Sequence, residues 1–128
     1  MYKYSDGGRE DAGFKGKKDC AVRAFTIATG IPYLEARKLL REASNKGRLG
    51  SRAISKGVYK DDMTSALKPL GWVWCSAPKF EGRKARYDDI EGLAILRMAH
   101  HFVAVRDGVL YDTFDSRNKM VYGYWKEG

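Results

Sequence analysis

The segment of residues 20–29 is apolar nearly all the way round a helix, with Arg23 as its one charged side chain. A helix with so little polar surface must be buried under the rest of the chain. Asp19, directly before it, is a favourable helix N-cap residue, and Gly30 with Pro32 ends the helix. We therefore expect a buried helix over residues 20–29.

The chain is long enough for one domain built around one core. It has 128 residues, of which 44% are hydrophobic and 31% charged, a globular composition. Residues 1–18 are rich in glycine and charge, and we expect them to form an N-terminal arm. The sequence thus predicts a single domain over residues 1–128.

Two more helices are expected after the buried one. The first covers residues 33–43, and the second covers residues 60–70 and stops at Gly71. The apolar stripe of the first is expected to consist of Leu34, Leu39, Leu40 and Ala43. Residues 44–57 carry no acidic residue and are expected to form a basic loop, with the cations Lys46, Arg48, Arg52 and Lys56.

The remainder of the chain has the pattern of β-strands. A strand is expected at residues 72–75, and four more follow at residues 93–97, 101–106, 109–115 and 120–125. Asp107-Gly108 is a dipeptide favoured in a two-residue type I′ turn, which predicts a hairpin. Helices first and antiparallel strands after them indicate an α+β fold, with the helices packed on a C-terminal antiparallel sheet.

Cys20 is the candidate nucleophile because it opens the buried helix. Unpaired N–H groups and the helix dipole at that end favour an anion, and Lys17 and Lys18 add positive charge nearby. Such surroundings lower the pKa of a thiol. Taken alone, a free cysteine is more often a packing residue, which is what we expect of Cys75.

His101 is the candidate base for this thiol. It begins a strongly apolar strand, where packing alone does not call for an imidazole. An imidazole beside a thiol can act as a general base or hold an ion pair with the thiolate. His100 is the competing candidate.

Asp112 is the candidate third member. In a hairpin with a two-residue turn, Asp112 lies diagonally across from His101 on the same face, and it can hold the imidazole. A β-bulge at Gly108 would reverse the later side chains and bring Asp115 to that face instead.

A thiol at a buried helix start, then a histidine opening a strand, then an aspartate on the next strand is the chain order of papain-like folds. The chain resembles the C39-type cysteine peptidases and, more closely, small phage and bacterial proteins of that type. The matching segments are Asp19-Cys20-Ala21-Val22-Arg23-Ala24, Thr29-Gly30-Ile31-Pro32-Tyr33, His101-Phe102-Val103-Ala104-Val105, Asp112-Thr113-Phe114-Asp115 and Val121-Tyr122-Gly123-Tyr124-Trp125. The resemblance implies a papain-like cysteine hydrolase, a peptidase or amidase that attacks an amide or thioester carbonyl with Cys20, His101 and Asp112.

One departure from that family leaves a second function open. Papain-like peptidases place a glutamine shortly before the cysteine to bind the oxyanion, whereas this sequence contains no glutamine and has Phe14, Lys15 and Gly16 in that region. The Cys20 backbone N–H with another donor can serve instead. The alternative is a basic binding protein, or a catalytically degenerate papain-like scaffold.

Charge and hydropathy bear on partners and location. The net charge of +8 suits an acidic protein or nucleic acid bound through basic loops, beside a peptide or protein substrate. No apolar run is long enough to span a bilayer and no signal peptide is evident, so we expect no membrane partner and a cytoplasmic location, the host cytoplasm if the protein is viral. Metal-ligand spacing is lacking, and we expect neither metal nor cofactor. We expect the aromatic run of Tyr122, Tyr124 and Trp125 to belong to the core rather than to a substrate wall.

Overall fold

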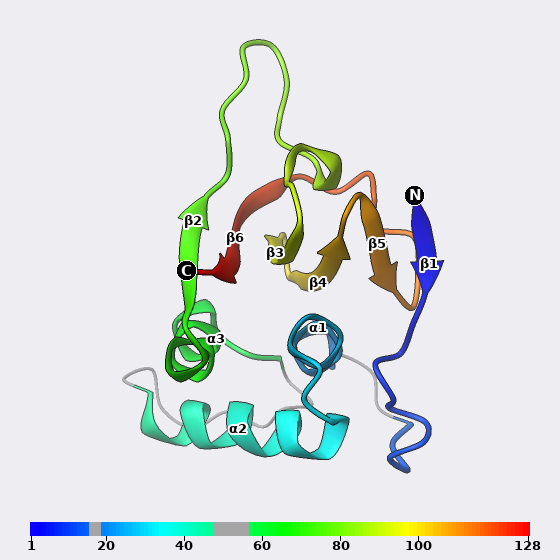
Figure 1. Ribbon diagram of the computed structural model, residues 1–128, viewed down its shortest axis with the longest axis vertical. Coiled ribbons are helices and arrows are strands. Elements are labelled where there is room, and N and C mark those ends of the chain that lie inside the picture. The colour runs from blue at the N-terminus through cyan, green and yellow to red at the C-terminus, as the bar shows by residue number, and fades with distance from the viewer. Residues whose placement is uncertain (16–18, 48–56) are drawn as a thin grey trace.

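The computed structural model describes residues 1–15, 19–47 and 57–128. Across these residues, a six-stranded sheet in the order β1-β5-β4-β3-β6-β2 lies beside three α-helices (Figure 1). Neighbouring strands are antiparallel except β1 and β5, which are parallel. The expected α+β class and the antiparallel character of the C-terminal strands are confirmed.

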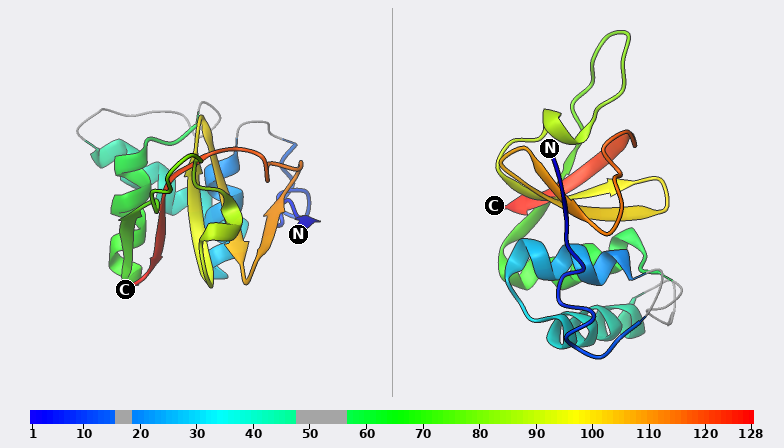
Figure 2. Two further views of the ribbon diagram at one scale, coloured as in Figure 1. Left: turned by 90° about the horizontal axis from the view of Figure 1, so that it is seen from above. Right: turned by 90° about the vertical axis from the view of Figure 1, so that its right-hand side faces the viewer.

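The helices form two layers on one side of the sheet. They are α1 (Cys20–Thr29), α2 (Tyr33–Lys46) and α3 (Lys60–Leu67), and a short 3-10 turn, η2 (Lys68–Leu70), continues α3. The helices α1 and α3 lie between the sheet and α2 (Figures 1 and 2). This placement explains why α1 has almost no polar surface. As expected, α1 ends at Gly30, whose φ of 79° is left-handed.

The strands are short, and tight turns join β3 to β4 and β4 to β5. Their bounds are β1 (Tyr2–Tyr4), β2 (Trp72–Ser76), β3 (Leu93–Met98), β4 (His101–Arg106), β5 (Val109–Asp112) and β6 (Val121–Glu127), and a 3-10 turn, η3 (Tyr87–Asp89), precedes β3. The last strand, β6, lies between β3 and β2. The sheet is therefore complete only when β6 is in place.

Both faces of the central strands are covered. On the helical side, Ile95 and Trp125 pack with Phe25 of α1. On the other side, Val103 and Leu110 belong to a second cluster, which residues 85–90 help to cover. Strands buried on both faces need apolar side chains at nearly every position, which accounts for the apolar runs over residues 93–96 of β3 and 102–105 of β4.

The β4–β5 hairpin has the predicted turn. Asp107 and Gly108 have φ values of 48° and 80°, both positive as a type I′ turn requires. The strand pairing begins with Arg106 and Val109 and continues without a bulge to Ala104 and Tyr111. The strand β5 ends at Asp112, three positions before the expected end.

The first residues of the expected N-terminal arm form a strand that was not predicted. Tyr2 to Tyr4 form β1, in register with Leu110 to Asp112 of β5. Three residues are too few to show an alternating pattern, so the strand exists because β5 offers it a free edge.

Two further expectations about the helical half need correction. The buried face of α2 is formed by Tyr33, Ala36, Leu40 and Ser44, whereas Leu34 is 57% exposed, because the covered side is set by contact with α1 and α3. Lys46 belongs to α2 and not to a loop. The other cations of the expected basic loop, Arg48, Arg52 and Lys56, lie outside the described residues.

Candidate active site

Three side chains from distant parts of the sequence meet where α1 begins. Cys20 is the first residue of α1, His101 the first of β4 and Asp112 the last of β5. The imidazole Nε2 of His101 lies 2.5 Å from Oδ2 of Asp112. The thiol of Cys20 is hydrogen-bonded to the His101 side chain and to the backbone N–H of Phe102. Because Nε2 faces Asp112, Nδ1 is the imidazole nitrogen left to serve the thiol.

The Asp112 carboxylate is buried, and several donors contact it. Its carboxylate accepts hydrogen bonds from the backbone N–H of Thr113 (2.7 Å) and from the hydroxyl of Ser116 (2.8 Å), and Arg23 lies 3.4 Å away. Burial raises the pKa of Asp112, but the hydrogen bond and charge of His101 with these other donors outweigh it and lower the pKa. The carboxylate therefore stays ionised and can hold the imidazole.

The competing residues lie elsewhere. Asp115 is exposed and forms a bidentate pair with Arg117, which lowers the pKa of Asp115 to about 2. His100 occupies the tight turn between β3 and β4, with a φ of 51°, and is exposed. The structure thus brings Asp112 and not Asp115 to His101.

The pKa values of the thiol and the imidazole move in opposite directions. Burial is the largest influence on Cys20 and raises its pKa, yet the hydrogen bonds from His101 and Phe102 and the charges of His101 and Arg23 outweigh it and lower the pKa. For His101, burial lowers the pKa, but Asp112 and Cys20 together raise it to about 9. These directions favour a thiolate–imidazolium pair at neutral pH.

A second buried carboxylate stands behind this pair. Asp19 occupies the N-cap position of α1, as expected, but its side chain makes no cap hydrogen bond. It is 2% exposed and instead contacts the guanidinium of Arg23, that of Arg9 at 3.1 Å, and the hydroxyl of Tyr33 at 2.6 Å. Burial and the hydrogen bond to Asp19 raise the pKa of Tyr33 to about 12, so the phenol stays a donor.

Arg23 links the two carboxylates, and sequence reasoning missed its role. It is 6% exposed and reaches Asp19 on one side and Asp112 on the other. The available signal was its position as the one charge in an apolar helix, four residues after Asp19. Lys17 and Lys18, which were expected to supply positive charge, lie outside the described residues.

The region where papain-like enzymes carry a glutamine is partly visible. Phe14 packs against Tyr33, with ring centroids 5.5 Å apart, and the guanidinium of Arg37 lies 4.3 Å above the Phe14 ring. The Phe14 side chain therefore packs against α2 and has no polar group that could bind an oxyanion. Gly16 lies outside the described residues.

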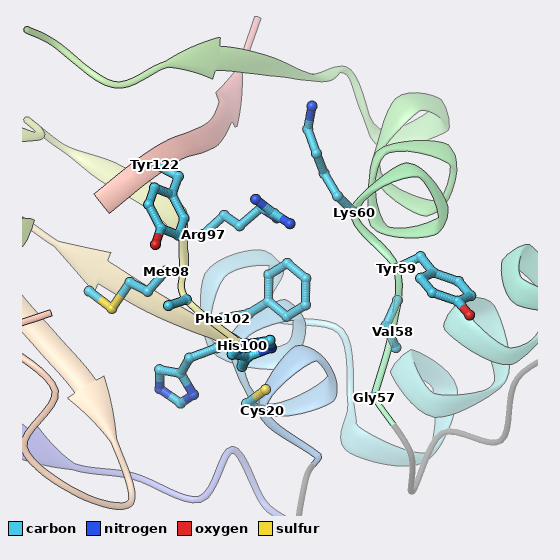
Figure 3. Close-up of a pocket in the computed structure, with 12 residues that line it drawn as sticks. Cys20, Gly57, Val58, Tyr59, Lys60, Arg97, Met98, His100, Phe102 and Tyr122 are labelled. Carbon is cyan, nitrogen blue, oxygen red and sulfur yellow. The ribbon is translucent and has the colours of Figure 1, made fainter. Parts of the chain in front are cut away.

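A cavity of about 370 Å³ opens beside Cys20 (Figure 3). Residues 57–60 form one wall, and the β3–β4 turn with Arg97 and Tyr122 forms the other. Trp125 is core, as expected, but Tyr122 is 43% exposed and lines this cavity, so its expected place in the core is wrong. Side chains alternate along β6, so Tyr122 and Trp125 lie on opposite faces of the sheet, and Trp125 faces the core that the helices cover.

The other candidate features are separate from this site. Cys75 is half-buried in β2, opposite Tyr124. Among the described residues, no group of His, Cys, Asp and Glu side chains could hold a metal ion, and no helix has the length and apolar character needed to cross a membrane.

No family model, curated protein or solved structure matches this chain.

Proposed function

We propose that this protein is a cysteine-dependent hydrolase of the papain-like type that acts on an amide or thioester carbonyl. The observation that carries the proposal is the meeting of Cys20, His101 and Asp112, three residues expected from the sequence to form a triad, in one hydrogen-bonded row beside an open cavity. Hydrolysis by a thiol needs a nucleophile, a side chain that transfers protons, and a group that orients this side chain. Cys20, His101 and Asp112 can supply these three roles in that order.

Each residue has a defined step. The Cys20 thiolate attacks the carbonyl carbon, and the imidazolium of His101 gives its proton to the leaving amine or thiol as the carbon–nitrogen or carbon–sulfur bond breaks. His101 then takes a proton from water, the hydroxide attacks the acyl carbon, and the carbon–sulfur bond breaks to release the acid product and restore the Cys20 thiolate beside the His101 imidazolium. Asp112 holds the imidazole through Nε2 throughout.

The oxyanion needs donors other than a glutamine side chain. Cys20 is the first residue of α1, so its backbone N–H has no partner within the helix, and we expect it to donate to the oxyanion. The dipole of a ten-residue helix adds to the stabilisation. With one fixed donor fewer than in papain-like peptidases, we expect turnover to be slow relative to thiol reactivity.

Iodoacetamide at neutral pH tests the nucleophile. Cys20 should be alkylated about tenfold faster than Cys75 in the folded protein, because its thiolate is favoured and it opens to the cavity. Site-resolved mass spectrometry after brief labelling measures both rates. Labelling in urea is the control, since the two rates should then converge, and Cys20→Ser should abolish hydrolysis of acyl substrates. Equal alkylation rates for Cys20 and Cys75 in the folded protein would contradict the assignment of Cys20 as the nucleophile. The chain would then be a binding scaffold.

The third residue is tested by a matched pair of variants. Asp112→Asn should slow hydrolysis by about a hundredfold or more, because an amide favours the wrong imidazole tautomer. Asp115→Asn should change the rate less than twofold, since Asp115 contacts only Arg117 at the surface. Thermal melts of both variants serve as the folding control. A loss confined to Asp115→Asn would contradict the assignment.

A further inference from the structure

The cavity beside Cys20 is lined by positive charge. Among the described residues that line it, Lys60 and Arg97 are formally charged, His100 and His101 are imidazoles, and none is a carboxylate. The Cys20 thiolate and the His101 imidazolium offset each other. Lys60 and Arg97 therefore carry the remaining formal charge among the described residues that line the cavity.

Aromatic rings, and not carboxylates, hold these two cations. The ammonium of Lys60 lies 4.1 Å above the Trp74 ring, and the guanidinium of Arg97 lies 6.0 Å from the Tyr122 ring. A ring face fixes the position of a cation but leaves its full formal charge. Within the described part of the chain, neither cation has a carboxylate within salt-bridge distance.

Two walls bring the cations to one opening. Lys60 begins α3, and Arg97 lies in β3, where it pairs with Phe102. Figure 3 shows Lys60 and Arg97 on opposite walls, with Cys20 at the end of the opening. Asp62, near Lys60 in sequence, lies against Gly47 at the end of α2 and does not line the cavity.

The size of the cavity limits what can occupy it. At about 370 Å³ it lies near the lower end of the range for small-ligand sites, roughly 300–1,000 Å³. This is room for one side chain with its peptide unit. Because Cys20 also lines the cavity, a group bound here lies near the bond that Cys20 attacks.

We infer that the substrate carries a carboxylate on the acyl side of the scissile bond, in the form of an acidic residue whose side chain sits between Lys60 and Arg97. This inference rests on the proposed function, since it uses Cys20 as the attacking atom. Each partly exposed cation should favour an acidic side chain over a neutral one by a modest factor in rate. The two factors multiply when the two cations act independently.

Three affinity reagents test the inference: the N-acetyl chloromethyl ketones of glutamate, glutamine and lysine. In each, the Cys20 sulfur forms a bond to the methylene carbon and chloride leaves. The glutamate reagent should modify Cys20 about tenfold faster than the isosteric glutamine reagent, and the lysine reagent should be slowest. Mass spectrometry of the Cys20 adduct against time gives the three rates.

Variants then assign the selectivity to the two cations. Lys60→Met and Arg97→Met should each lower the glutamate-to-glutamine rate ratio about threefold, and the double variant should bring it near one. Lys126→Met, an exposed cation of β6 outside the cavity, should keep the wild-type ratio. Raising salt to 1 M should lower the wild-type ratio, which tests the idea even if a variant fails to fold.

The outcomes separate the inference from the function on which it rests. If all three reagents modify Cys20 at one rate, the acidic substrate is excluded and the hydrolase proposal stands. If none modifies a reduced Cys20, the hydrolase proposal fails. Equal rates for the glutamate and glutamine reagents, with protection of Cys20 by a short oligodeoxynucleotide, would overturn the inference and assign the cations to phosphate groups.

Discussion

Arg23 is a positioning residue, because it touches Asp112 and not the reacting atoms. It bridges two buried carboxylates, and its loss would leave both with fewer partners. Arg23→Met should lower the free energy of unfolding by about 3 kcal/mol, as expected when a buried ion pair loses one partner. It should also raise the pKa of Cys20, because Arg23 is one of the charges that lower it.

The pH profile of Cys20 alkylation separates positioning from stability alone. In Arg23→Met the profile should move to higher pH, and Arg23→Lys should restore part of the shift by restoring the charge. Arg41→Met, at an exposed position of α2, is the matched control and should leave the profile in place. A destabilised Arg23→Met with an unmoved profile would show that Arg23 only supports the fold.

The opposite pKa shifts of Cys20 and His101 have a consequence for stability. A raised histidine pKa stabilises the fold below the unfolded value of 6.5, and this contribution is lost as pH rises through the folded pKa of about 9. A lowered cysteine pKa acts in the reverse sense and adds stability as pH rises toward the ordinary thiol value of 9.0. Between about pH 6.5 and pH 9 the two contributions oppose each other in the wild type.

Cys20→Ser removes one side of this balance. Asp112 still raises the pKa of His101 in that variant. Between pH 6 and pH 9, the free energy of unfolding of Cys20→Ser should therefore fall by about 1 kcal/mol more than that of the wild type. Urea unfolding at the two pH values measures the difference. Cys75→Ser should follow the wild type, and a Cys20→Ser curve parallel to both would contradict the coupling.

At the level of elements, β6 depends on a glycine where it meets β2. A side chain at Gly123 would collide with the ring of Trp74 and with the carbonyl oxygen of Cys75, since a Cβ there would lie 2.3 Å and 2.9 Å from them. The Trp74 ring can move, whereas the carbonyl belongs to the strand pairing itself. The absence of a side chain at Gly123 is therefore what lets Trp74 lie across β6.

Gly123→Ala should lower the free energy of unfolding by about 2 kcal/mol, the cost of overpacking a closed site. Chemical denaturation measures the loss. Gly123→Ala in a Trp74→Ala background should cost less, because only the backbone contact then remains. An additive double variant would show that Trp74 does not press on this position.

The elements that were predicted correctly depend on local chemistry. The turn at Asp107-Gly108 requires two positive φ values, and few dipeptides accept them, so the hairpin and the meeting of His101 with Asp112 could be expected from the sequence. The buried face of α2 and the strand β1 could not, because their positions are decided by partners far away in the chain.

At the level of the whole molecule, the site has a part that sequence can indicate and a part that it cannot. Cys20 and His101 stand out because a thiol at a helix start and an imidazole in an apolar strand are locally unusual. Lys60 and Arg97 are ordinary surface cations in the sequence, and only the packing of α3 beside the β3–β4 turn places both at one cavity. The order of strands in the sheet likewise follows from long-range pairing.

The late position of β6 also bears on when the thiol becomes reactive during synthesis. Cys20 leaves the ribosome more than eighty residues ahead of His101, and β6, which joins β3 to β2, follows later still. At roughly 5–20 residues per second, the cysteine is present for several seconds as an ordinary thiol with no imidazole to ionise it. On the proposed function, Cys20 therefore gains its imidazole partner only after β4 has been made, and a shorter nascent chain carries the cysteine as an ordinary thiol.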